Sequence, residues 1–131
     1  IEPMVGKGTE LAFGMVNDPQ FGPMVMVGSG GIYIEVLKDR VFSLAPFDDV
    51  EAMRMIDSLR TRPLLAGVRG AKPADLTQLA KQLANFSHLA ADLADVVSEI
   101  DVNPIIVNDS GSIAVDALVI AKPLVTEQSA A

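Results

Sequence analysis

The chain has 131 residues, half of them hydrophobic, a formal net charge of −7 at pH 7 and no cysteine. This length is that of one ordinary domain with enough apolar material for a core. The acidic balance argues against a nucleic-acid surface, which needs clustered Lys and Arg, and the lack of cysteine excludes disulfides and zinc–thiolate sites. No apolar run is long enough to span a membrane and no signal peptide is visible, so we expect a cytoplasmic protein.

Four short strands are predicted in the first third of the chain, at residues 11–16, 24–27, 32–36 and 41–45. Turn-forming residues separate them: Asn17-Asp18-Pro19 follows the first, and the glycine-rich stretch 28–31 follows the second. That stretch is either a nest of backbone amides that holds phosphate or a plain turn between strands. Adjacent strands joined by short turns favour antiparallel pairing.

A first helix is predicted from a capping box, with Asp48 as N-cap and Glu51 three residues later. An apolar stripe follows at helical spacing, consisting of Val50, Met53, Ile56 and Leu59. We expect this helix to end around Arg60 and Arg62, just before Pro63.

A second, longer helix is predicted to begin near Pro73, a favourable first-turn residue. Its apolar stripe is expected to comprise Leu76, Leu79, Leu83, Phe86, Leu89 or Ala90, Leu93 and Val97. His88, the one histidine, lies off this stripe, so we interpret it as a structural or surface residue.

The chain is predicted to end in a β-hairpin, with strands at 99–107 and 112–119 and a turn at 108–111. This turn sets the register, in which Asn103 lies directly opposite Asp116. Asp101 is two residues before Asn103 and shares its face. The other face, carrying Ile100, Val102, Ile106, Ile113 and Val115, is expected to pack against the long helix.

Two carboxylates and one amide oxygen at one end of the hairpin suit a hard cation such as Mg²⁺. From geometry alone, Asp101, Asn103 and Asp116 are either metal ligands or solvated residues at a strand end. Strands first, then two helices, then a hairpin, make a mixed α/β or α+β fold with a largely antiparallel sheet packed against two helices.

The run Glu99-Ile100-Asp101-Val102-Asn103-Pro104-Ile105-Ile106-Val107, followed by Asp116, resembles the metal-binding hairpin of ATP-grasp enzymes, above all the ADP-forming acyl-CoA synthetases. Other segments resemble the same family in the same order. They are Gly8-Thr9-Glu10-Leu11, Asp18-Pro19-Gln20-Phe21-Gly22-Pro23, Gly28-Ser29-Gly30-Gly31-Ile32 with Glu35-Val36-Leu37-Lys38-Asp39, and Leu64-Leu65-Ala66-Gly67-Val68-Arg69-Gly70. The resemblance implies that residues 1–121 are the second half, or C-terminal lobe, of an ATP-grasp domain, and that 122–131 is a disordered tail.

The resemblance also implies roles for individual residues. Asp101, Asn103 and Asp116 would hold Mg²⁺ against the phosphates of ATP or ADP. The hinge strand at the start of the chain would lie along adenine, with Glu10 near the ribose or metal, and two glycines would allow close approach of the backbone. The residues implied to bind nucleotide are Glu2, Met4, Val5, Glu10, Gly30 and Gly31.

For function, the resemblance implies part of an acid–thiol ligase that interconverts acyl-CoA, ADP and phosphate with carboxylic acid, CoA and ATP. The partners would be nucleotide and the CoA-binding and ligase domains or subunits of the same enzyme, with a phosphohistidine elsewhere and a homo-oligomer as one possible assembly. The chain opens at Ile1, and we expect a piece of a longer protein that is inactive alone because the first ATP-grasp lobe is missing. The alternative is a regulatory ATP-grasp module of a protein acetyltransferase.

Overall fold

The computed structural model describes residues 8–30, 39–67 and 72–123. Within these ranges the chain forms six strands and three helices. In chain order they are β1 Thr9–Asp18, β2 Gly22–Ser29, β3 Arg40–Leu44, α2 Asp49–Asp57, α3 Arg62–Leu65, α4 Leu76–Asp92, β4 Val97–Asn108, β5 Gly111–Ala114 and β6 Ala117–Ala121. The strand expected at 32–36 and the tail residues 124–131 lie outside the described residues.

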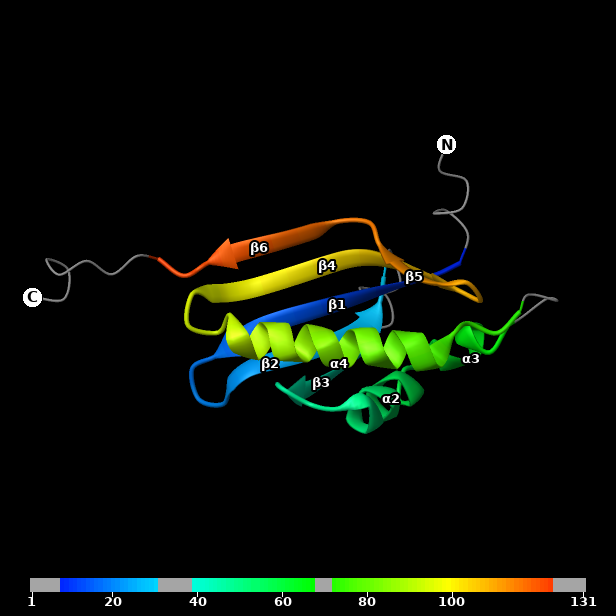
Figure 1. The fold of residues 1–131 in the computed structure, drawn as a ribbon, viewed down its shortest axis with the longest axis horizontal. Helices are drawn as coiled ribbons and strands as arrows, with labels where there is room; N and C mark the ends of the chain where they lie inside the picture. Colours follow the sequence, from blue (N-terminus) through cyan, green and yellow to red (C-terminus); the bar gives the residue numbers. More distant parts are fainter. Residues whose placement is uncertain (1–7, 31–38, 68–71, 124–131) are drawn as a thin grey trace, which may run out of the picture.

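The six strands form one antiparallel sheet in the order β3-β2-β1-β4-β5, and β6 also pairs with β4. Long α4 crosses one face of this sheet with α2 beside it (Figure 1). The predicted α+β architecture with a largely antiparallel sheet is therefore confirmed.

The core lies between the sheet and the helices. Leu11, Phe13 and Met15 alternate along β1 and are buried on the helix side, where they meet Leu79 and Leu83 of α4. The rings of Phe13 and Phe86 lie 5.6 Å apart, centroid to centroid. The alternate residues of β1 and the residues at helical spacing on α4 thus form the two sides of one apolar layer.

The first helix begins where the capping pattern predicts and ends earlier than expected. The side chain of Asp48 accepts a hydrogen bond from the backbone N–H of Glu51 at 3.0 Å. The buried side chains are Ala52, Met55, Ile56 and Leu59, whereas Val50 is 77% exposed. The predicted stripe was therefore wrong at Val50, because the helix is rotated so that Ala52, Met55 and Ile56 face the core.

Pro63 begins a helix instead of following one. The expected end of the first helix near Arg60 and Arg62 was wrong, since α2 ends at Asp57 and Pro63 lies in the first turn of α3. Proline fits that position because its missing N–H would have no partner in the helix.

The long helix is shorter at both ends than predicted. Asp75 caps its start by accepting a hydrogen bond from Gln78 N at 3.1 Å. Ala90, which is fully buried, continues the stripe, while Leu89 is 49% exposed. Val97, expected on the helix, is the first residue of β4.

The predicted hairpin register is confirmed. Asn108 pairs with Gly111 and Val107 with Ser112, and the side chain of Asn108 accepts a hydrogen bond from Ser110 N at 2.8 Å within the turn. Further along, Asp101 pairs with Leu118 on β6, as the same register requires.

A β-bulge in β4 changes which residues face the helices. Leu11 of β1 pairs with Ile105, but Phe13 pairs with Val102, so β4 has one extra residue here, at Asn103 and Pro104. Beyond the bulge, Ile105 and Val107 join the core, which Ile106 does not.

The bulge also changes which side chains of the hairpin's outer strand face the helices. Ile106 pairs with Ile113 on the face away from the helices. Ile113 and Val115 are 54% and 50% exposed. The prediction that Ile106, Ile113 and Val115 pack on the long helix was therefore wrong, whereas it held for Ile100 and Val102.

Candidate functional site

The face of the sheet away from α2 and α4, here called the open face, carries the candidate residues. Because Leu11, Phe13 and Met15 point into the core, their neighbours Glu10, Ala12 and Gly14 are turned to the open face. Ala12 is 1% exposed and Gly14 is buried, so neighbouring side chains cover the middle of this face. A Cβ on Gly14 would lie 3.0 Å from Met26 Cε, so that methionine covers part of it.

Asn103 and Asp116 lie directly opposite each other, as the sequence predicts. The N–H of Asn103 donates to the carbonyl oxygen of Asp116 at 3.1 Å, and Val115 N–H donates to Pro104 O at 2.9 Å. These two bonds lie between the β4–β5 ladder, which ends at Ile105 and Ala114, and the β4–β6 ladder, which ends at Val102 and Ala117. Asp101 pairs with Gly14 of β1, which puts it on the open face.

The side chains of this set are accessible and oxygen-rich. Asp101 and Asp116 are exposed and Asn103 is half-buried. One carboxylate oxygen of Asp116 accepts the N–H of Ala117 at 2.9 Å, which orients the carboxylate. Hard oxygen donors of this kind fit Mg²⁺, which takes one or two protein carboxylates and completes its shell with water and phosphate.

In the part of the chain that the structure describes, no three His, Cys, Asp or Glu side chains gather into a metal-binding group. The candidate set is consistent with that finding because it has only two carboxylates and its third member is an amide. Such a set is more typical of a cation shared with a ligand than of a cation held by protein alone.

Glu10 and Gly30 lie together at the end of the open face where β1 begins. Glu10 is exposed, and its carbonyl oxygen accepts the N–H of Gly30 at 2.9 Å. A Cβ on Gly30 would lie only 2.9 Å from the carbonyl oxygen of Leu11. Gly30 thus has a packing role within the protein in addition to any role toward a ligand.

Glu10 is separated from the carboxylate of β4. It pairs with Ile106, whereas Asp101 pairs with Gly14, four residues further along β1. At about 3.3 Å per residue, this is a separation of about 13 Å along the strand. A ligand touching both groups would therefore have to lie lengthwise on the open face.

Several predicted site residues lie outside the described residues. These are Glu2, Met4, Val5 and Gly31. Their predicted roles stay predictions.

Sequence reasoning missed a buried polar cluster next to the site, formed by Ser29, Asp39 and Thr61. Asp39 accepts hydrogen bonds from Arg60 N at 2.6 Å, from Ser29 Oγ at 2.7 Å and from Thr61 N at 2.9 Å. Burial raises the pKa of Asp39, but together these hydrogen bonds lower it by more, so the net shift is downward. The cluster ties β2 and β3 to the connection between α2 and α3.

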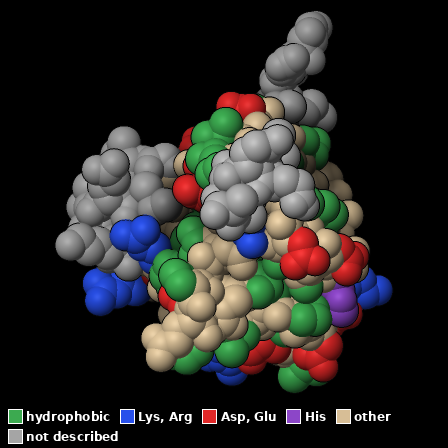
Figure 2. All heavy atoms as spheres, turned by 90° about the vertical axis from the view of Figure 1, so that its left-hand side faces the viewer, with side chains coloured by type: hydrophobic (Ala, Val, Ile, Leu, Met, Phe, Trp, Pro, Cys, Tyr) green, Lys and Arg blue, Asp and Glu red, His purple; other side chains and the backbone are tan. Residues whose placement is uncertain are grey.

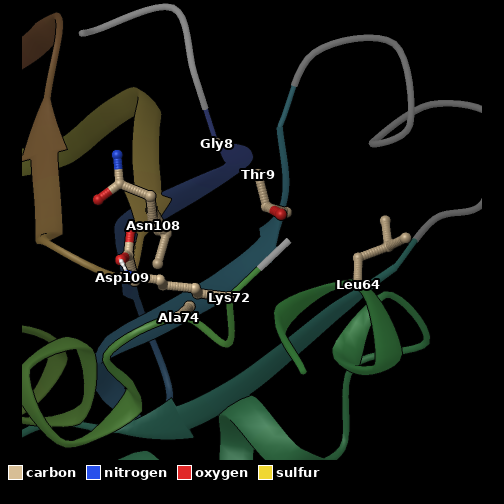
Figure 3. Close-up of a pocket in the computed structure, with 8 residues that line it drawn as sticks. Gly8, Thr9, Leu64, Lys72, Ala74, Asn108 and Asp109 are labelled. Atoms are coloured by element: carbon tan, nitrogen blue, oxygen red, sulfur yellow. Dashed lines mark ion pairs between the residues drawn. The ribbon is translucent and has the colours of Figure 1, made fainter. Parts of the chain in front are cut away.

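A cavity of about 250 Å³ lies near the start of β1 and the end of β4 (Figure 3). Gly8, Thr9 and Leu64 line it together with Lys72 and Asp109, whose charged atoms are 4.0 Å apart. It does not include the paired residues of the candidate cation site, and its volume is below that of most ligand pockets, which start at roughly 300 Å³.

Surface charge, the histidine and the helices of the described residues indicate no second kind of functional site. On the end of the molecule that Figure 2 shows, acidic and basic side chains are interspersed with hydrophobic ones, and neither charge covers that end continuously. His88 is exposed on α4. Over residues 8–30, 39–67 and 72–123, no helix combines the length and apolar character needed to cross a bilayer.

A family model described as an ATP-grasp domain matches residues 1–120. Among curated proteins, the chain is 41% identical over 124 residues to the β subunit of acetate–CoA ligase [ADP-forming] II of Pyrococcus furiosus, which covers 93% of this chain and 52% of that subunit. It is 47% identical over 111 residues to 4-hydroxybutyrate–CoA ligase [ADP-forming] of Nitrosopumilus maritimus, covering 85% of this chain and 16% of that protein. The chain thus spans about half of the first relative and a smaller part of the second.

Solved structures share the fold. A protein of Pyrococcus horikoshii superposes with a TM-score of 0.84 at 39% identity, covering 92% of this chain and 52% of that one. A dinucleotide-forming acetyl-coenzyme A synthetase 1 of Ca. Korarchaeum cryptofilum, in complex with coenzyme A and Mg-AMPPCP, superposes with a TM-score of 0.80 at 35% identity. That match covers 88% of this chain and 54% of the other.

Proposed function

Because this chain belongs to the ATP-grasp family, we propose that it is the nucleotide- and Mg²⁺-binding second half of the ATP-grasp domain of an ADP-forming acyl-CoA synthetase. The observation that carries the proposal is the pairing of Asn103 with Asp116 beside Asp101 on the open face. Relatives of high identity that are ADP-forming CoA ligases by name support the reaction class.

In the proposed site, Asp101, Asn103 and Asp116 hold Mg²⁺ through their side-chain oxygens. The bound cation would neutralise charge on the phosphates of the nucleotide. The hydrogen bond from Ala117 N–H keeps one oxygen of Asp116 directed along its own backbone, so the carboxylate is oriented before a cation arrives. Glu10 lies further along the open face, about 13 Å from Asp101 along the strand, so it would contact the ribose and not a metal held by Asp101.

The proposed reaction of the whole enzyme interconverts acyl-CoA, ADP and phosphate with carboxylic acid, CoA and ATP, through a phosphohistidine on another domain or subunit. We do not assign His88 to that group, because it lies within helix α4, on the side of the sheet opposite the candidate site, and its sequence surroundings match no phosphohistidine motif. The relatives described above are CoA ligases by name, which favours a synthetase over a regulatory module of a protein acetyltransferase.

The test is the Mg²⁺ dependence of ADP binding by the chain, measured by titration calorimetry with Mg²⁺ present or chelated. Asp116→Ala is expected to remove most of the Mg²⁺-dependent part of the affinity, about tenfold or more, because the cation loses one of its two carboxylates. Binding by the 131-residue chain alone is expected to be weak, since it spans about half the length of its Pyrococcus furiosus relative. In the complete synthetase the same substitution is expected to abolish ATP formation with the fold intact.

Asp92→Ala is the matched control, because Asp92 is an exposed aspartate at the end of α4. It should bind ADP with the same Mg²⁺ dependence as the unmodified chain. An Asp116→Ala variant with unchanged Mg²⁺ dependence would show that Asp116 is not a ligand.

A further inference from the structure

Strand β6 lies at the edge of the sheet and exposes apolar side chains on both faces. Among the described strands it pairs with β4 alone. Leu118, Val119 and Ile120 are 58%, 55% and 42% exposed, and the strand contains no charged residue. Monomeric proteins commonly protect such an edge with charges, proline or a covering segment, because unpaired backbone groups can pair with another chain. In β6 itself this protection is missing.

The backbone groups that β6 turns outward belong to alternate residues. Asp116 O accepts from Asn103 N, and Lys122 N donates to Val96 O at 2.9 Å, so between these two residues, along β6, the even-numbered positions turn their backbone toward β4. In an antiparallel ladder, successive residues turn their hydrogen-bonding groups to opposite sides. The N–H and C=O groups of Ala117, Val119 and Ala121 therefore face the outer edge.

We propose that β6 pairs with β6 of a second copy of this chain, antiparallel and about a two-fold axis at Val119. The strand sequence Ala-Leu-Val-Ile-Ala is nearly the same read in either direction from Val119. In this register Val119 opposes its own counterpart, and Leu118 opposes Ile120. Each Val119 N–H donates to the Val119 carbonyl oxygen of the other copy, and the isologous contact closes as a dimer.

The same register also brings opposite charges together at both ends of the pair. Asp116 precedes Val119 by three residues and Lys122 follows it by three. Asp116 of one copy is therefore opposite Lys122 of the other, and this happens twice. Opposite charges in directly opposed positions stabilise a strand pair. A shift by two residues would lose both pairs, because Lys122 would then oppose Ala114 or Leu118.

The dimer does not depend on the proposed nucleotide chemistry. Asp116 belongs to both proposals, so the variants that test the dimer leave it unchanged. Sedimentation velocity of the 131-residue chain at rising concentration is the measurement, and the unmodified chain is expected to shift from monomer to dimer.

Val119→Lys is the main variant, because it places two ammonium groups beside each other at the axis. It is expected to raise the dissociation constant of the dimer about tenfold or more. Val50→Lys is the matched control: it makes the same substitution on α2, at a side chain that is 77% exposed. That variant is expected to dimerise like the unmodified chain.

Lys122→Glu is the second variant and leaves the apolar strand intact. It sets two glutamates opposite the two aspartates, so it should weaken the dimer most at low salt. It reports on the register even if Val119→Lys proves unable to fold, which circular dichroism would reveal. A chain that stays monomeric throughout, or a Lys122→Glu variant that dimerises unchanged, overturns the proposal.

Discussion

Replacing Asp39 with asparagine tests how firmly the end of β2 is held beside the candidate site. Asp39 is 3% exposed. One of its oxygens accepts Arg60 N, and the other accepts both Ser29 Oγ and Thr61 N. An asparagine has a single acceptor oxygen, so in either orientation its NH₂ group faces at least one backbone N–H donor.

The expected loss of stability is about 2–4 kcal/mol. A buried donor without a partner costs about 1–3 kcal/mol. The hydrogen bonds that remain would go to a neutral amide, and each is weaker by about 1 kcal/mol than a bond to a charged carboxylate. Both effects act in the same direction.

The loss should depend on pH. The pKa of Asp39 in the folded protein is lowered from 3.8, so the carboxylate's contribution to stability is fully present above the unfolded value. It disappears as pH falls through the folded value, when the carboxyl group is protonated. The difference between the two proteins should therefore be largest at neutral pH and shrink in acid.

Urea unfolding followed by far-ultraviolet circular dichroism is the assay, since the chain has no tryptophan to serve as a fluorescent reporter. Asp92→Asn, at an exposed position, is the control and should change stability by less than about 0.5 kcal/mol. The reasoning is refuted if Asp39→Asn is as stable as that control, or if its deficit is the same at neutral and acid pH.

Two further substitutions probe the strand contacts and the surface charges. Gly30→Ala would place a methyl group 2.9 Å from Leu11 O and should cost about 1–3 kcal/mol; an unchanged melting temperature would contradict this. Hydrogen bonds from Arg54 and Ser43 lower the pKa of Glu51 to about 2, so its contribution is full above 4.5 and is lost as pH falls toward 2. Glu51→Gln should reduce stability by no more than about 1 kcal/mol at neutral pH because the ion pair is partly exposed. Urea unfolding should show that most of this difference is lost by pH 2, and a difference that keeps its neutral-pH size there would contradict the assignment.

The pairing at the candidate site followed from the sequence because it depends on one turn. Once the turn chemistry of residues 108–111 closes the hairpin, the pairs from the turn as far as Glu99 with Ile120 are determined, and Asn103 bonds to Asp116 within this stretch. The N-cap at Asp48 was predictable for the same reason, since a cap is a contact between residues three apart.

Which face each hairpin residue takes could not be read from the hairpin alone. The bulge at Asn103 and Pro104 is a mismatch between β4 and β1, strands that are far apart in the chain. Pro104 has no N–H for a ladder, which marks the place, but the extra residue exists only relative to its partner strand. It moves Ile105 into the core and turns Ile106 away from the helices.

The sequence by itself determined the approximate places of most described strands, the capped start of α2, the hairpin register next to its turn and the family resemblance, since these depend on residue type at short spacing. Tertiary structure alone decided the rotation of α2, the faces beyond the bulge and the burial of Asp39 among hydrogen-bond donors from two other segments. The physical reason is that burial and hydrogen bonding between distant segments depend on how elements pack, and local periodicity carries no information about that packing.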